Sequence, residues 1–263
     1  MSNLDSLPRT EPAVADEEPA VRLDDVVKVF GQGPEAVRAL DGVSLDVPEG
    51  QFTCLIGASG CGKSTLLSLV AGLEDTSRGA IDIGGRRVAL MFQESALFPW
   101  LTAAGNVELA LRTNGASRSA ARGRAAELLD LVHLGGLGRK RPHELSGGMR
   151  QRVALARALA QDAHVLLMDE PFGALDAMTR DLLHDELERI WSQEKLTVLF
   201  VTHNVREAVR LGDRVVLLSS RPGRVVGTFD VDGERPRRID SPEVASMAAT
   251  ITDRLREEVA RHG

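Results

Sequence analysis

The amino-acid sequence predicts an α/β fold with a largely parallel sheet, an antiparallel β region near the N-terminus and an inserted α-helical subdomain. Three observations carry this prediction. Short β-branched runs alternate with helical patterns in the second half of the chain. Residues 165–168 and 198–201 are continuously apolar, as a sheet covered on both faces requires. Residues from about 103 to 161 have mostly helical periodicity instead, which indicates an inserted subdomain over about 94–161.

The N-terminal part reads as successive strands. Residues 21–30, 37–48 and 51–57 are short, β-branched and bounded by Gly, Pro and Asp. The third strand runs into a glycine-rich turn, and residues 63–71 then have helical spacing. Residues 79–93 again have the residue pattern of strands.

Two amphipathic patterns indicate helices in the inserted subdomain. Each places small and apolar residues on one face at helical spacing. The first face consists of Ala121, Ala125, Leu128, Leu129 and Val132, and the second of Val153, Ala156, Leu159 and Ala160.

The α/β pattern resumes after this subdomain. The expected elements are a strand over 164–171, a helix over 176–193, a strand over 196–203, a helix over 204–212 and a strand over 213–220. We divide the chain into a disordered tail (1–20), one main domain (21–223) and a short C-terminal extension (224–263) with a hairpin and a terminal helix.

Composition excludes several classes of function. The 263 residues carry a formal net charge of -6, and the basic residues are scattered, so no nucleic-acid partner is expected. Cys54 and Cys61 lack metal-ligand spacing, which argues against a zinc site or a disulfide framework. Apolar runs are too short for a signal peptide core or a bilayer span, so any membrane role would act through a partner.

A phosphate-binding loop is the clearest motif. The stretch "GASGCGKST" matches G-x-x-x-x-G-K-[ST] between an apolar strand and a helix, which predicts a P-loop NTPase core that binds ATP. Glycines let backbone N–H groups face the phosphates, Lys63 reaches the β- and γ-phosphates, and Ser64 ligates Mg²⁺. A glycine-rich turn that binds nothing is the alternative. The expected nucleotide-binding residues here are Gly57, Ala58, Ser59, Gly60, Cys61, Gly62, Lys63, Ser64 and Thr65.

Acidic and imidazole side chains end the neighbouring strands. Asp169 and Glu170 follow a buried strand, where open α/β sheets bind ligands. We expect Asp169 to hold Mg²⁺ and Glu170 to accept a proton from the attacking water. His203 ends the next strand and is expected to contact phosphate or orient the acid. The alternatives are helix-capping acids and a structural histidine.

With the stretch "LSGGMRQR" at residues 145–152, the chain resembles the ATP-binding subunit of ABC transporters from about Val21 to Gly223. The resemblance implies that Ser146, Gly147 and Gly148, in the helical subdomain, contact ATP held by another subunit. Met149 stands where glutamine is common. An ordinary helix N-cap is a compatible interpretation of Ser146.

Other site residues follow from the same resemblance. Phe30 matches the aromatic residue that stacks on adenine, although tyrosine is more usual. Gln93 matches the glutamine that touches Mg²⁺ or the attacking water, so Mg²⁺ would be held by Ser64, Gln93 and Asp169. Asp176 matches the aspartate of the D-loop. His203 matches the switch histidine, followed by asparagine where aspartate is frequent.

The resemblance also implies partners. Two identical cassettes would pair head to tail around ATP and bind transmembrane permease subunits at the cytoplasmic face of the membrane, served by an extracytoplasmic solute-binding protein. Residues 91–107, 171–180 and 218–225 look like importers of nitrate, alkanesulfonates and taurine. Phe98, Pro99 and Trp100 would receive the permease or pack within the subdomain. Import of another small solute, a soluble ABC ATPase and a P-loop kinase are the alternatives.

Overall fold

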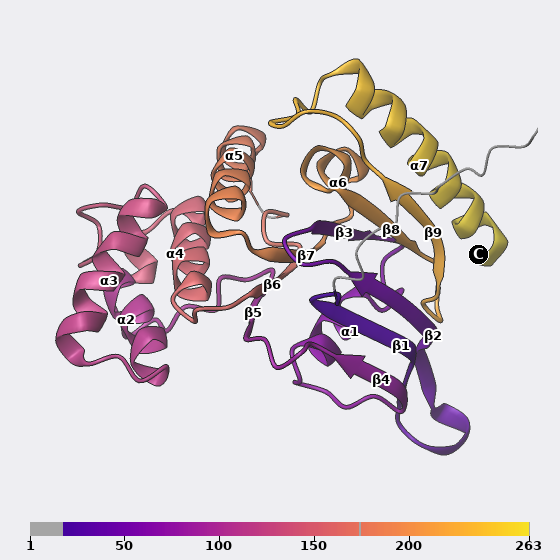
Figure 1. Ribbon diagram of the computed structural model, residues 1–263, viewed down its shortest axis with the longest axis horizontal. Helices are drawn as coiled ribbons and strands as arrows, with labels where there is room; N and C mark the ends of the chain where they lie inside the picture. The colour runs from indigo at the N-terminus through magenta and orange to yellow at the C-terminus, as the bar shows by residue number, and fades with distance from the viewer. Residues whose placement is uncertain (1–17, 174, 263) are drawn as a thin grey trace, which may run out of the picture.

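The computed structural model describes residues 18–173 and 175–262, arranged as two sheets with covering helices and a helical lobe (Figure 1). Most of the predicted tail lies outside the described residues. Its last residue, Ala20, is fully buried and donates its N–H to Val47 O at 2.8 Å. The ordered fold therefore begins before Val21, because the first strand pairing extends one residue further than the β-branched pattern.

The elements follow each other in the expected alternating order. The strands are β1 (Val21–Phe30), β2 (Val37–Val47), β3 (Phe52–Ile56), β4 (Arg78–Asp82), β5 (Val88–Met91), β6 (Val165–Asp169), β7 (Thr197–Val201), β8 (Arg214–Leu218) and β9 (Val225–Asp230). The α-helices are α1 (Lys63–Val70), α2 (Ala103–Thr113), α3 (Arg118–Leu131), α4 (Gly147–Leu159), α5 (Ala177–Glu194), α6 (Val205–Leu211) and α7 (Pro242–His262), with short 3-10 turns at Gly33–Glu35 and Pro142–Glu144.

A six-stranded sheet forms the centre, in the order β5-β6-β7-β3-β8-β9. Neighbouring strands from β5 to β8 pair in parallel, and β9 pairs antiparallel with β8 as a hairpin. A separate antiparallel sheet has the order β2-β1-β4. The fold class predicted from the sequence is confirmed. Residues 79–93, however, contribute β4 to one sheet and β5 to the other.

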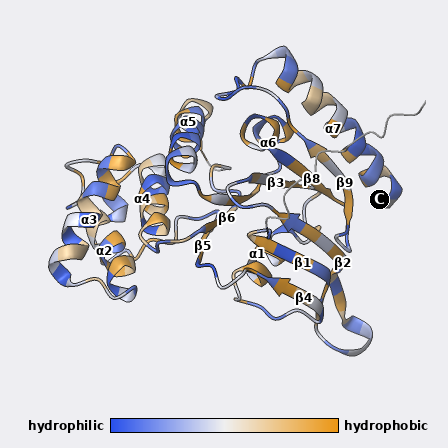
Figure 2. Cartoon of the chain, viewed as in Figure 1, coloured by the Kyte–Doolittle hydropathy of each residue, from blue (hydrophilic) through white to orange (hydrophobic). Residues whose placement is uncertain are grey.

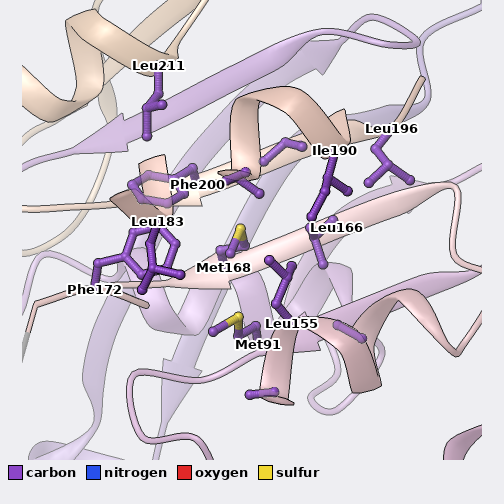
Figure 3. Close-up of a cluster of buried hydrophobic side chains, with 14 of the residues drawn as sticks. Met91, Leu155, Leu166, Met168, Phe172, Leu183, Ile190, Leu196, Phe200 and Leu211 are labelled. Atoms are coloured by element: carbon purple, nitrogen blue, oxygen red, sulfur yellow. The ribbon is translucent and has the colours of Figure 1, made fainter. Parts of the chain in front are cut away.

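Strands β3, β6, β7 and β8 of the central sheet are buried on both faces because they are mostly apolar. One face packs under α4, α5, α6 and α7, and the other packs against α1 and the antiparallel sheet. Orange, hydrophobic positions accordingly concentrate along the central strands in Figure 2. Figure 3 shows the first of these cores, where Leu183 and Phe200 lie beside Phe172.

The helical lobe consists of α2, α3 and α4 and extends to one side of the sheets (Figure 1). Side-chain oxygens of Thr102, Ser117 and Ser146 cap the N-termini of these helices. The predicted faces are buried, except that Leu159 is only partly so. Ala154, Leu155 and Ala158 are buried as well, because α4 packs against both the lobe and the sheet.

The C-terminal segment, predicted as a short extension with a hairpin and a terminal helix, packs against the rest of the fold. Strand β9 completes one edge of the central sheet. Helix α7 packs on α6 and buries Val244, Ala248 and Ile251 at helical spacing. Within the described residues, no helix has the length and apolar character needed to traverse a bilayer.

We predict that shortening Leu199, in the middle of β7, destabilises the protein strongly. Leu199 is 0% exposed, so Leu199→Ala leaves a cavity and lowers the free energy of unfolding by about 2 to 5 kcal/mol. The matched control is Leu73→Ala, at a residue that is 61% exposed, with a change below about 0.5 kcal/mol. Denaturant unfolding measures both values, and equal losses would contradict the assigned core.

Candidate functional site

The site lies where three parallel strands end. Strands β3, β7 and β6 are neighbours, and their register pairs Leu55 with Val201 and Asp169 with Val201. The P-loop follows β3, Asp169 ends β6 with Glu170 directly after it, and His203 follows β7. Parallel pairing thus brings all three segments to the same edge of the sheet.

The P-loop backbone depends on glycine at close approaches. Gly62 has a φ of +99°, and a Cβ there would lie 2.7 Å from Leu40 Cδ2 and 2.9 Å from Ala39 O. Lys63 is buried, and its Nζ donates to Gly57 O at 2.9 Å and Ala58 O at 3.1 Å. The loop therefore holds the ammonium group at the start of α1, beside the N–H groups of the helix N-terminus.

A cavity of about 530 Å³ opens beside this loop. It combines the expected phosphate-binding residues with an aromatic ring, an amide and a carboxylate. The lining residues are Phe30, Val37, Ala39, Ser59, Gly60, Gly62, Lys63, Ser64, Thr65, Gln93, Glu170 and Arg221. Residues from the antiparallel sheet, from the start of α1 and from the loops after β3, β5, β6 and β8 therefore meet around one space.

Asp169 lies beside the P-loop, within hydrogen-bonding reach of Ser64. Burial raises the pKa of the Asp169 carboxyl, while the hydrogen bond from Ser64 lowers it and the charge of Glu170 raises it. The carboxylates of Asp169 and Glu170 are adjacent and partly buried, so a cation bound near them would be stabilised. The oxygen donors of Ser64, Asp169 and Gln93 are of the kind that Mg²⁺ prefers.

Glu170 and His203 are in direct contact. His203 Nδ1 lies 2.9 Å from Glu170 Oε2, and the Glu170 N–H donates to Val201 O at 3.0 Å. Glu170 has a φ of +44°, which is rare for a residue with a side chain. Its surroundings therefore hold the carboxylate in a conformation that the residue would seldom adopt alone.

Gln93 is close to the same carboxylate. A Cβ at Gly173 would lie 3.8 Å from both Gln93 Nε2 and Glu170 Oε2, so the two side chains flank this glycine. The backbone carbonyl of Gln93 accepts a hydrogen bond from Gln151 Nε2 on α4 at 2.8 Å. The segment after β5 is thus tied to the helical lobe.

Phe30 presents its ring at the cavity. It is 40% exposed, and Lys28 Nζ lies 4.9 Å from its ring centroid. An aromatic ring in this position offers a stacking surface for a base.

The second glycine motif lies apart from this cavity. Ser146 Oγ accepts from the Met149 N–H at 3.3 Å and caps α4, as the helix N-cap interpretation expects. Cβ atoms at Gly147 and Gly148 would lie near Leu175 and Thr179 of the same chain. Among the described residues, those that line the P-loop cavity include none of Ser146, Gly147 and Gly148, which we call the signature residues.

Asp176 is also placed outside the cavity lining. Its carboxylate accepts from the Thr179 N–H at 3.0 Å and caps α5. The N–H and hydroxyl of Thr179 both hydrogen-bond to Asp176 and lower the pKa of its carboxyl.

Sequence reasoning missed Arg221. Its Nε donates to Gly60 O at 3.3 Å, and its side chain lines the cavity. The turn that carries it is fixed by hydrogen bonds from Gly223 N to Ala39 O and from Asp41 N to Gly223 O. This pairing joins segments far apart in the chain, so local spacing offered no signal for it.

Comparison with known proteins identifies the family. The model of the family described as "ABC transporter" matches residues 40–173. An aliphatic sulfonates import ATP-binding protein, SsuB 1, of Mesorhizobium japonicum is 46% identical over 252 residues, covering 94% of this chain and 92% of that protein. A taurine import ATP-binding protein, TauB, of Rhizobium johnstonii is 46% identical, covering 85% of this chain and 88% of that protein.

A solved structure agrees with these relatives. A dimeric post-hydrolysis state of the ATP-binding cassette MJ0796 bound to ADP and Pi superposes with a TM-score of 0.73 at 33% identity. The likeness covers 81% of this chain and 100% of that one. The sheet edge, the P-loop cavity and these likenesses together establish that the chain belongs to the ABC transporter family.

Proposed function

We propose that this chain is the ATP-binding subunit of an ABC transporter, which hydrolyses ATP to drive import of a small anion such as nitrate, an alkanesulfonate or taurine. The observation that carries the ATPase part is the meeting of Lys63, Glu170 and His203 at one sheet edge. The names of the sulfonate and taurine import relatives support the small anion. Import of another small solute is the alternative.

The residues that line the cavity support nucleotide binding. The P-loop N–H groups and the N-terminus of α1 bind the phosphates, with Lys63 at the β- and γ-phosphates. Phe30 stacks on the adenine ring. The guanidinium of Arg221 adds positive charge to the same space.

Hydrolysis uses Glu170 as general base toward the attacking water. Because a carboxylate only accepts, His203 donates to it from Nδ1, and this contact favours the orienting role of the histidine. Ser64, Gln93 and Asp169 would hold Mg²⁺, because their hydroxyl, amide and carboxylate oxygens are the donors that this ion prefers. When bound there, Mg²⁺ would supply positive charge against the phosphate oxygens.

The separation of the signature from its own cavity supports a two-fold dimer. Ser146, Gly147 and Gly148 carry the helix N-terminus that suits an anion, but they lack a neighbouring lysine from the same segment. In a head-to-tail pair, they complete the site of the partner copy. Asp176, two residues before the exposed Met178, belongs to the same interface in this arrangement.

A permease contact is supported by an exposed aromatic pair. Trp100 is 67% exposed and its ring centroid lies 5.3 Å from that of Phe98. Packing within the lobe leaves Trp100 mostly uncovered, which favours docking of a transmembrane partner here. The subunit would then sit at the cytoplasmic face of the membrane, supplied by an extracytoplasmic solute-binding protein.

Reconstitution tests this function directly. The chain, its permease and the binding protein in proteoliposomes should take up labelled taurine, sulfonate or nitrate only with ATP. A soluble ABC ATPase would instead hydrolyse ATP without associating with a permease, and uptake without ATP would refute the proposal.

We predict that Glu170→Gln lowers ATP hydrolysis at least about a hundredfold, because the amide cannot accept the proton. ATP binding persists, so ATP-dependent dimers accumulate. Phosphate release and size-exclusion chromatography with ATP measure the two effects. Hydrolysis within twofold of wild type would rule out Glu170 as the base.

We predict that two inactive variants restore activity when mixed. Lys63→Ala removes the P-loop cation and Ser146→Arg blocks the signature, so a hybrid dimer keeps one intact composite site. An equal mixture should reach about a quarter of wild-type activity, because half of the dimers are hybrids. Circular dichroism controls for folding, and a mixture no more active than either variant contradicts the trans arrangement.

We predict that hydrolysis stops when EDTA removes divalent cations and returns with Mg²⁺. Asp169→Asn should raise the Mg²⁺ concentration for half-maximal hydrolysis at least about tenfold, because it removes a charged ligand. Asp162→Asn, at an exposed aspartate paired with Arg87, is the matched control. Hydrolysis that survives EDTA would contradict the metal site.

A further inference from the structure

We propose that Thr202 is a positioning residue for ATP hydrolysis, which holds His203 against Glu170 through a buried hydrogen-bond chain anchored on Glu207 and His184. This inference rests on the proposed hydrolytic roles of Glu170 and His203. It assigns a task to buried polar groups that the nucleotide cavity itself does not use.

The chain of hydrogen bonds begins directly before His203. Thr202 is 2% exposed, and its hydroxyl donates to the Glu207 carboxylate while accepting from the Asn204 N–H at 3.0 Å. Its own N–H donates to Leu55 O at 3.2 Å. The residues on both sides of His203 are therefore held by one hydroxyl, which fixes the turn that carries the imidazole.

Glu207 is held in turn by His184. The second carboxylate oxygen of Glu207 lies 2.6 Å from His184 Nε2, and His184 Nδ1 lies 2.8 Å from Arg210 Nη1. Arginine only donates, so Nδ1 accepts and Nε2 carries the proton that goes to Glu207. Both carboxylate oxygens of this buried glutamate are thereby satisfied, and its orientation is set by α5 and α6 together.

The same cluster also contacts a residue close to Glu170 in the chain. The His184 ring packs edge-on against Phe172 with centroids 5.5 Å apart, and Phe172 follows Glu170 by two residues. Figure 3 places Phe172 beside Leu183 and Phe200 in the closely packed core. The turn at Glu170, which has a positive φ, and the turn that carries His203 are therefore both connected to His184.

Stability alone does not account for this cluster. Apolar residues of similar volume commonly replace buried charged groups without loss of stability, because they avoid the desolvation of a buried carboxylate. Apolar side chains could not, however, orient the Thr202 hydroxyl that accepts a hydrogen bond from the Asn204 N–H, next to His203. The geometry therefore points to alignment of the Glu170 to His203 contact.

The test removes only the hydroxyl. Thr202→Val should lower kcat for ATP hydrolysis at least about tenfold while the Kd for ATP stays within twofold, because binding does not need His203. Thr202→Ser keeps the hydroxyl and should retain kcat within threefold. Thr202→Ala is made in parallel, so that the loss is tested with a second side chain if the valine variant unfolds.

Thr197→Val is the matched control at the other end of the same strand. Thr197 is 1% exposed, and its hydroxyl accepts from the Gly50 N–H at 3.0 Å. Replacing Thr197 with valine therefore removes a buried hydroxyl of the same kind as that of Thr202, but far from His203. This variant should keep kcat within twofold. Equal losses of kcat in Thr202→Val and Thr197→Val would overturn the proposal.

A double-mutant comparison separates positioning from general damage. If Thr202 acts through His203, adding Thr202→Val to His203→Ala should lower the residual kcat by less than twofold. A further tenfold loss in that background would overturn the proposal. Absence of hydrolysis by the wild-type dimer with Mg²⁺ would instead refute the proposed function, so the two failures are distinguishable.

Discussion

The parallel register of β3, β7 and β6 is the constraint on which the rest of the structure depends. These strands are apolar and covered on both faces, so a slip by one residue would move buried side chains out of their packed positions. Their ends therefore lie at fixed relative heights. The bond from Glu170 N to Val201 O continues this pairing into the site, where the strand geometry gives way to the turn at Glu170.

Charged side chains gather where these three strands end. Lys63, Asp169, Glu170 and Arg221 gather around the P-loop, and burial raises the pKa of Asp169. Such an arrangement is suited to phosphates and a cation together, because each offsets part of the charge of the other. Buried hydrogen bonds from Thr202 to Glu207 and from His184 to Glu207 begin at the residue directly before His203.

The helical lobe adds a different kind of constraint. Its attachment runs through Gln151 to the carbonyl of Gln93, and through Arg157 to the carbonyls of Ser95 and Ala96. The loop that follows β5 is thus held by α4, which also carries Ser146 at its N-terminus. Movement of the lobe would displace the Gln93 amide near Glu170, which offers a physical link between a partner on the lobe and the cavity.

The sequence by itself determined the features that local spacing encodes. Apolar strands, helix faces such as Ala121 with Ala125, and the glycines before Lys63 each follow from short-range patterns, and the fold class agrees with them. Tertiary structure decided what distant segments do together. It placed β4 and β5 in different sheets, joined β9 to the central sheet, and brought Arg221 to the P-loop. It also linked Thr202 to His184 through Glu207. The sequence could not predict this link, because side-chain hydrogen bonds between distant segments produce no periodic pattern in the chain.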